Sequence, residues 1–401
     1  MRRAAFIAAA AAVAAACAWG VLQLWDTSVP GGLDLDTRAA AATFDAAARE
    51  DAERFEAVMR WLFVASQAAL VAALVVYARR GVRLFQRESA AGPIGTGFLL
   101  GMMGLALVWL VQLPFGLVEI WWTRRNDALE VGYVEYVVGD FFGLAGEALF
   151  LCLLLLVVMA LARLLRSAWW LPGVAVLAGL AALAAWLTPY LIVELEKPPA
   201  GIAADARPLA AKQGVEGVPV RIEDVHEYTE QPNAYAAGLG ESRRVVLWNT
   251  LSEDFPRREV RSVLSHEFGH LQHDHIAKGI GWFAIFALPA ALIVTLVTRR
   301  RGGLGEPAAV PLALLVLVVL QLAASPLTSA GSRRYEAEAD WAALEATRDP
   351  RAMVALHHRF TEEALSDPDP PGWFHTLFDS HPSGAERVAM ARAWRERSRS
   401  R

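Results

Sequence analysis

Residues 266–270 read His-Glu-Phe-Gly-His, and they lie shortly before a long apolar stretch. On a helix, positions i and i+4 share a face, so His266 and His270 can both direct an imidazole nitrogen at one metal ion. This spacing is typical of a catalytic zinc site. Glu267 lies next to the first ligand, where it can take a proton from a metal-bound water. The alternative is a surface helix that carries two histidines and a glutamate.

A catalytic zinc needs a third protein ligand and keeps one position open. One known pattern places a third histidine six residues after the second, but here the following histidines lie three and five residues on. The other source is a distant carboxylate, and residues 335–340, Tyr-Glu-Ala-Glu-Ala-Asp, supply one. On a predicted helix, Glu336 could bind zinc while Asp340, at i+4, orients a ligand histidine. Spacing alone does not choose Glu336 over its neighbours, and Glu338 falls on another side of that helix.

The motifs of this chain resemble those of the M48 metallopeptidases, and among them the Ste24 type, also called CAAX prenyl protease 1. Two positions depart from the family pattern: Asn249 stands where Asp is usual, and Ser383 where Pro is usual. Neither belongs to the zinc set. The resemblance rests on four stretches in the family's order, namely 266–270 with His275, 335–340, Asn233-Ala234-Tyr235 with 243–251, and Ser380-His381-Pro382-Ser383 with Arg387.

The resemblance implies one Zn²⁺ held by His266, His270 and Glu336, with Glu267 as the general base and Asp340 in support of catalysis. It also implies a substrate side of the site. Its members are an edge strand Asn233-Ala234-Tyr235 that pairs with an extended peptide, and His381 with Arg387 at the oxyanion of the tetrahedral intermediate. Without the family, Asn-Ala-Tyr would indicate a plain strand or turn, and His-Pro a loop.

The composition indicates a membrane protein, because 55% of the 401 residues are hydrophobic. The first apolar stretch could instead be a signal-peptide core, but no sharp cleavage site follows Trp25. We therefore predict a mainly α, multi-pass fold whose seven transmembrane helices enclose a chamber, as the resemblance implies, with a small α+β peptidase domain at the membrane surface. Each stretch is about long enough to cross ~30 Å of hydrocarbon: residues 4–25, 58–78, 93–118, 141–162, 169–194, 280–298 and 307–328.

The chain is expected to divide into an N-terminal membrane region with five spans, 1–194, and an M48-like peptidase domain, 195–401, that includes the last two spans. A helix that continues from His270 to Ile280 covers only about 15 Å. Glu336 also follows the last span closely. The zinc is therefore expected near the membrane boundary, and the two-span hairpin accounts for the long gap between the ligands.

Two arguments disagree about which side of the membrane holds the zinc site. The positive-inside rule places the N-terminus in the cytoplasm and the zinc domain outside. The resemblance implies a catalytic domain that faces the cytosol. The charge bias favours the outside, because it is consistent across four short segments, at residues 2–3, 79–87, 163–166 and 299–301.

Together these features predict a zinc metalloendopeptidase in a bacterial plasma membrane that cuts membrane-associated proteins or peptides. One alternative is a quality-control protease of the HtpX kind, which has fewer spans. Another is a metal-binding sensor or scaffold, which would have no need of Glu267. The resemblance suggests cleavage after a prenylated cysteine, although such targets are unusual in bacteria. A net charge of −4 leaves no basic surface for nucleic acid, and the sequence does not indicate an oligomeric state.

Overall fold

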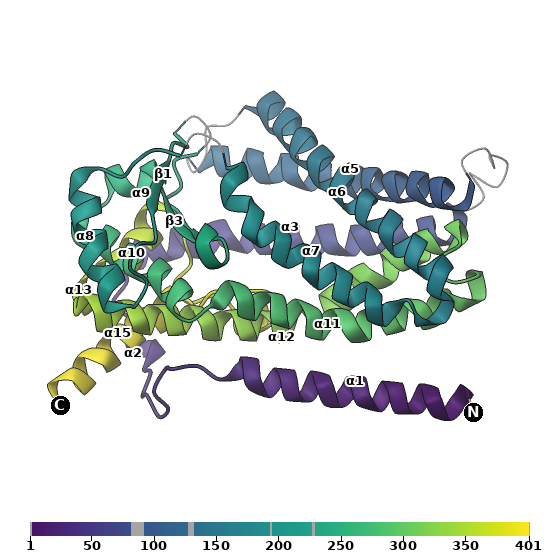
Figure 1. Ribbon diagram of the computed structural model, residues 1–401. Coiled ribbons are helices and arrows are strands. Elements are labelled where there is room, and N and C mark those ends of the chain that lie inside the picture. The colour runs from purple at the N-terminus through teal and green to yellow at the C-terminus, as the bar shows by residue number, and fades with distance from the viewer. Residues whose placement is uncertain (1, 82–91, 127–131, 193–194, 227–228, 401) are drawn as a thin grey trace.

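The computed structural model describes residues 2–81, 92–126, 132–192, 195–226 and 229–400, and it is mainly helical (Figure 1). Long helices run along the length of the molecule, while the small sheet and most of the short helices gather at one end. The long helices are α1 (Arg2–Trp25), α3 (Ala46–Arg80), α5 (Gly92–Arg125), α6 (Tyr133–Leu165), α7 (Trp170–Leu191), α11 (His275–Thr298) and α12 (Val310–Thr347).

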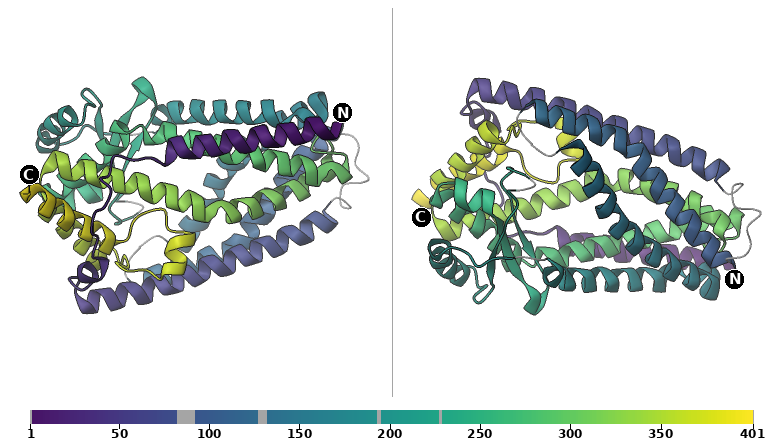
Figure 2. Two further views of the ribbon diagram at one scale, coloured as in Figure 1. Left: turned by 90° about the horizontal axis from the view of Figure 1, so that it is seen from below. Right: turned by 90° about the horizontal axis from the view of Figure 1, so that it is seen from above.

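Six of the seven predicted spans are confirmed as candidate membrane spans among the described residues, by length and apolar composition. The chain is accordingly a multi-pass membrane protein. The remaining predicted stretch, 4–25, forms α1, in which Ala11–Trp25 is counted only as a shorter apolar helix. A seventh span therefore stays a prediction. Helix α1 lies beside α11 (Figure 2), where Cys17 Sγ is 3.5 Å from the carbonyl oxygen of Ile285.

The shorter elements form the peptidase end of the molecule. Its sheet has the order β1-β3-β2, with β1 parallel and β2 antiparallel to the central β3. Strand β2 is thus an edge strand, as the family resemblance implied. The elements are α2 (Thr37–Ala41), α8 (Ala200–Lys212), β1 (Val220–Glu223), β2 (Ala234–Ala237), β3 (Arg244–Trp248), α9 (Asn249–Asp254), α10 (Arg257–Gln272), α13 (Pro350–Glu363), α14 (Gly372–Leu377) and α15 (Gly384–Arg399), with 3-10 turns at Arg166–Ala168, Gly240–Ser242, Arg299–Arg301 and Pro307–Ala309.

Helix α10 is positioned by one buried face. Leu264 and Phe268 are fully buried and share a core cluster with Val245 and Leu247 of β3. These two side chains are spaced i, i+4, so they anchor one side of the helix to the sheet. The sequence then leaves a different face of α10 for the polar residues of the pentapeptide.

The helices that carry the ligands meet the membrane spans in two different ways. Helix α12 is continuous over 38 residues, so the last span and Glu336 belong to one rigid element. Helix α10 instead ends at Gln272, and α11 begins at His275 after Asp274 with a φ of +53°. The expected continuous helix from His270 to Ile280 is therefore wrong, because this left-handed residue interrupts it.

The predicted domain division at residue 194 stays a prediction, and buried clusters extend across it. Leu70 and Leu74 of α3 pack with Val310 of α12 in one cluster. A second cluster joins Ala40 of α2 to Val388 of α15. The enclosed chamber likewise stays a prediction, and Arg83 and Arg87 of the predicted basic segment at 79–87 lie outside the described residues.

Candidate metal centre and active site

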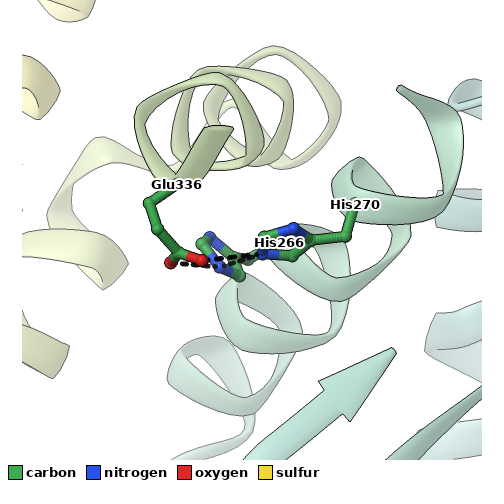
Figure 3. Close-up of side chains that lie close together, drawn as sticks. All are labelled: His266, His270 and Glu336. Atoms are coloured by element: carbon green, nitrogen blue, oxygen red, sulfur yellow. Dashed lines mark hydrogen bonds and ion pairs between the residues drawn. The ribbon is translucent and has the colours of Figure 1, made fainter. Parts of the chain in front are cut away.

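Three side chains converge where α10 crosses α12 (Figure 3). The Nε2 atoms of His266 and His270 lie 3.0 Å apart, and each is 3.4 Å from a carboxylate oxygen of Glu336. Among the described residues, these three form the group able to hold a metal ion, with ligand atoms within 4.8 Å of one another. The structure thus brings together the predicted ligand set.

The spacing of these atoms fits zinc. Ligands about 2.0–2.2 Å from a tetrahedral Zn²⁺ lie about 3.3–3.6 Å from one another. The two His-to-Glu distances fall in this range, and the His-to-His distance is slightly shorter. Two imidazole nitrogens and one carboxylate also leave a fourth position open, as a catalytic zinc requires.

The second nitrogen of His266 is fixed by a buried carboxylate. Nδ1 of His266 lies 2.8 Å from Oδ1 of Asp340, whose side chain is 2% exposed. Because Nε2 faces the metal position, Nδ1 carries the ring proton and donates it to Asp340. Asp340 therefore lies one turn along α12 from Glu336, as the sequence predicted, and its carboxylate contacts the ring of His266.

The second nitrogen of His270 is fixed by a longer chain of hydrogen bonds. Nδ1 of His270 lies 2.9 Å from Nδ1 of His275, and Nε2 of His275 lies 3.0 Å from Oε2 of Glu338. One set of proton positions satisfies both bonds: His270 donates to His275, and His275 donates to Glu338. This relay was missed from the sequence, although His275, five residues after His270, was a signal of it.

The N-terminal part of the chain also reaches this relay. The backbone N–H of Ser28, between α1 and α2, donates to Oε1 of Glu338 at 2.5 Å. Nearby, the hydroxyl of Tyr335 donates to the carbonyl of Leu24. The carboxylate of Glu338 is 2% exposed, so it needs partners such as the Ser28 N–H and His275 to remain charged. No pattern in the sequence indicated this contact.

Arg387 of α15 lies against the carboxylates of the site. Its guanidinium donates to Oδ1 of Asp340 at 3.0 Å and to Oε2 of Glu336 at 3.1 Å. His381 lies at the rim, with Nε2 3.5 Å from Glu336 and its side chain 64% exposed. The structure thus brings both residues of the C-terminal motif to the ligand set.

The electrostatics of the site favour a cation. Burial acts to lower the pKa of His266, but hydrogen bonds to Asp340 and Glu336 outweigh it and raise that pKa to about 10. Burial lowers the pKa of His270 to about 3, which keeps this ring neutral, the form that binds metal. The carboxylates around His266 therefore stabilise positive charge at the point where Zn²⁺ would sit.

Glu267 directly follows His266 on α10 and borders the same cavity as His266 and Glu336. Burial raises the pKa of Glu267 to about 7. The positive charge of His266 and a hydrogen bond from the backbone of Ala236 act to lower this pKa, but burial outweighs them. A carboxylate with this pKa can both accept and release a proton near neutral pH.

The structure places some of the residues predicted to bind substrate at the cavity and turns another away from it. Asn233 and Ala234 border the cavity. The hydroxyl of Tyr235 instead donates to Glu223 of β1 at 2.8 Å. The backbone N–H of Trp248 donates to Asn233, so strand alternation pairs Tyr235 with β3 and leaves the backbone groups of Ala234 and Ala236 on the free edge.

The cavity beside the metal group has a volume of about 290 Å³. One wall is apolar and comes from α9, α10 and α13, with Leu251, Val263, Met353, Leu356 and Phe360. His357 of α13 also borders it and is buried. Burial lowers the pKa of His357 to about 3, so the ring is neutral. No spacing of residues in the chain associates His357 with the site.

Gly269, inside the pentapeptide, sets the distance between the two ligand helices. A Cβ on Gly269 would lie 3.0 Å from Cα and 3.1 Å from the carbonyl oxygen of Ala339. These are backbone atoms of α12, which cannot give way as a flexible side chain would. Glycine therefore allows α10 and α12 to approach closely enough for Glu336 to meet the histidines.

Comparison with known proteins agrees with a metallopeptidase site. Residues 200–395 match peptidase family M48. The uncharacterized metalloprotease YhfN of Bacillus subtilis (strain 168) is 30% identical over 178 residues, which are 42% of this chain and 42% of that protein. A protease HtpX homolog of Methylibium petroleiphilum is 28% identical over 184 residues, 41% of this chain and 65% of that protein. The matches thus span less than two-thirds of these relatives.

The similarity in fold extends over both halves of the chain. A crystal structure of S. mikatae Ste24p superposes with a TM-score of 0.74 and 18% identity, over 96% of this chain and 97% of that one. The membrane helices that carry no motif are therefore arranged as in that protein. Residues 200–395 of this chain thus match peptidase family M48, and the chain as a whole has the fold of Ste24p.

Proposed function

We propose that this protein is a zinc-dependent membrane endopeptidase. The observation that carries the proposal is the orientation of both histidines. Each presents Nε2 to a common point beside Glu336, while its Nδ1 is held by a separate partner, Asp340 or His275. A surface helix with histidines at i, i+4 by chance would have no reason to anchor both rings from behind.

The catalytic chemistry is divided between the metal and Glu267. His266, His270 and Glu336 would hold a zinc ion, which would supply a Lewis acid able to polarise a peptide carbonyl and lower the pKa of water. Glu267 borders the cavity on the side of α10 next to this point. Its carboxylate takes the proton of the attacking water and passes it to the nitrogen of the leaving amine.

The substrate backbone is proposed to bind along β2. The N–H groups of Ala234 and Ala236 are engaged by Asn233 and Glu267, so the C=O groups of these two residues, which face away from β3, are the ones proposed to pair with an extended peptide that lies over the metal group. The apolar wall formed with Met353, Leu356 and Phe360 suits an apolar side chain next to the cut bond. In this arrangement Asn233 lies just before the edge strand, and the hydrogen bond from Tyr235 to Glu223 holds β2 in place.

His381 and Arg387 receive different roles in the proposal. His381 is exposed at the rim, so its Nε2–H can donate to an oxyanion that develops over the metal group. The guanidinium of Arg387 is engaged by Glu336 and Asp340. We therefore assign Arg387 first to holding these two carboxylates, with contact to substrate as a secondary role.

The proposed substrates are membrane-associated proteins or peptides, because α12 joins Glu336 rigidly to a membrane span. Cleavage next to a lipid-modified cysteine and quality control of the HtpX kind are both compatible with this site. The membrane helices are arranged as in Ste24p. This arrangement favours cleavage next to a lipid-modified cysteine over quality control by a protease with fewer spans.

The test uses the purified full-length chain in detergent. Cleavage of a peptide library should stop after chelation, return with Zn²⁺, and be absent from a Glu267→Gln variant that still binds one zinc. Substrates trapped on that variant in cells and identified by mass spectrometry would give the substrate class. Cleavage that survives chelation or the Glu267→Gln change would reject the mechanism, and zinc binding without any cleavage would favour the sensor alternative.

A further inference from the structure

A second cavity lies at the end of the molecule opposite the metal centre. It has a volume of about 430 Å³ and lies where α6 meets α7 and α11 meets α12. Figure 1 shows the turn between α11 and α12 at the far end from α10. Helix α11 has 24 residues, so it separates the two sites by about 36 Å. This is about the thickness of the hydrocarbon core, which places the cavity at the other membrane boundary.

Three arginines border this cavity, and two of them are uncompensated. Arg163 is engaged by the carbonyl of Gly305 at 3.1 Å and by Glu306 at 3.2 Å. Arg166 and Arg299 are exposed and form no ion pair with any residue that the structure describes. Two free guanidinium groups on one concave surface repel each other, so the cavity favours an anion.

The base of the cavity is firmly packed. Trp169 is 4% and Leu304 5% exposed, and both belong to a buried cluster that joins α6, α7, α11 and α12. Above this base the chain has glycine at 302 and 303, with φ of +89° and +82°. A Cβ on Gly303 would meet nothing within 4 Å, so backbone rather than side chains borders the open space there. The arginines therefore border a cavity that has a firmly packed base.

We propose that this cavity binds the phosphate group of an acidic phospholipid. A guanidinium matches phosphate oxygens with two parallel hydrogen bonds and keeps its charge at a membrane surface. The volume lies in the range of small-ligand sites, and the position at a membrane boundary favours a lipid headgroup over a solute. The apolar surface of the surrounding spans then accommodates the acyl chains.

The proposal is tested on the full-length protein in detergent by native mass spectrometry. The ligands are a short-chain phosphatidylglycerol, phosphatidylcholine of the same chain length, and inorganic phosphate. We expect one saturable phosphatidylglycerol site. The double variant Arg166→Gln/Arg299→Gln should weaken it on the order of 30-fold, from about fivefold for each arginine. Zinc content should remain that of the wild type, because the metal site is distant.

The matched control is Arg80→Gln/Arg300→Gln, which removes the same charge from exposed residues at the same end but outside the cavity lining. It should retain the affinity of the wild type. Equal weakening by both double variants would show a diffuse charge effect and overturn the proposal, as would phosphatidylcholine binding as tightly as phosphatidylglycerol. Displacement of the lipid by inorganic phosphate at equal concentration would assign a soluble phosphate and reject the phospholipid.

Discussion

Replacement of His275 by alanine should weaken zinc binding although His275 does not touch the metal position. The change removes the acceptor of the Nδ1–H of His270, which lies 2.9 Å away in the structure. The side chain of His270 is only 17% exposed, so water replaces the lost partner poorly. A buried donor left without a partner costs about 1–3 kcal/mol. We therefore expect zinc to bind about 10- to 100-fold more weakly.

The measurement is the dissociation constant for zinc, by competition with a fluorescent chelator in detergent at pH 7.5. His273→Ala is the matched control, because Nδ1 of His273 lies 3.4 Å from Glu338 but has no hydrogen bond to His270. That control should bind zinc as the wild type does. An unchanged zinc dissociation constant for His275→Ala would refute the reasoning. Equal weakening of zinc binding in both variants would show that the effect arises from the contacts of both histidines with Glu338. Melting curves of the metal-free proteins show whether the variants are folded.

Three further changes test other parts of the structure. Glu267→Gln should retain one zinc by mass spectrometry and lose about 10²- to 10⁴-fold in kcat; a smaller loss would contradict its role as a base. Gly269→Ala should lower stability by about 1–3 kcal/mol, because its Cβ would lie 3.0 Å from Cα of Ala339. Gly279→Ala, where a Cβ meets nothing within 4 Å, is the control and should be neutral or stabilising in thermal unfolding. The hydrogen bonds of His375 to Asp379 and Glu386 raise its pKa to about 9. This contribution to stability is complete below pH about 6.5 and is lost as the pH rises through 9. Melting temperatures of wild type and His375→Gln should therefore converge between pH 6.5 and 9.5, and a constant difference would contradict the assignment.

The sequence predicted the parts of the site that local geometry controls. His266 and His270 share a face because a helix has 3.6 residues per turn, and this holds wherever the helix is placed. The same argument placed Asp340 one turn from Glu336. Six apolar helices also followed from local patterns, because span length is visible in a single segment, whereas the edge strand at β2 was implied only by the family resemblance.

Other features depended on packing between segments that are distant in the chain. Spacing could not choose Glu336 as the third ligand, because every acidic residue of its run lies on some face of the helix. Only the crossing of α10 and α12, permitted by Gly269, determines which carboxylate meets the histidines. The break at Asp274 was also missed, because a positive φ at aspartate has no distinct signature in one sequence.

The role of Glu338 shows the same division. The sequence correctly placed it on a different side of α12 from Glu336, and from that it was expected to be an ordinary acidic residue. In the structure that side faces His275 and the backbone of Ser28, so Glu338 supports His270 through a relay. The sequence alone determined which residues could bind a metal and which segments could cross a membrane, because both follow from the geometry of one helix. The tertiary structure decided which of them meet, because that depends on how helices from both halves of the chain pack together.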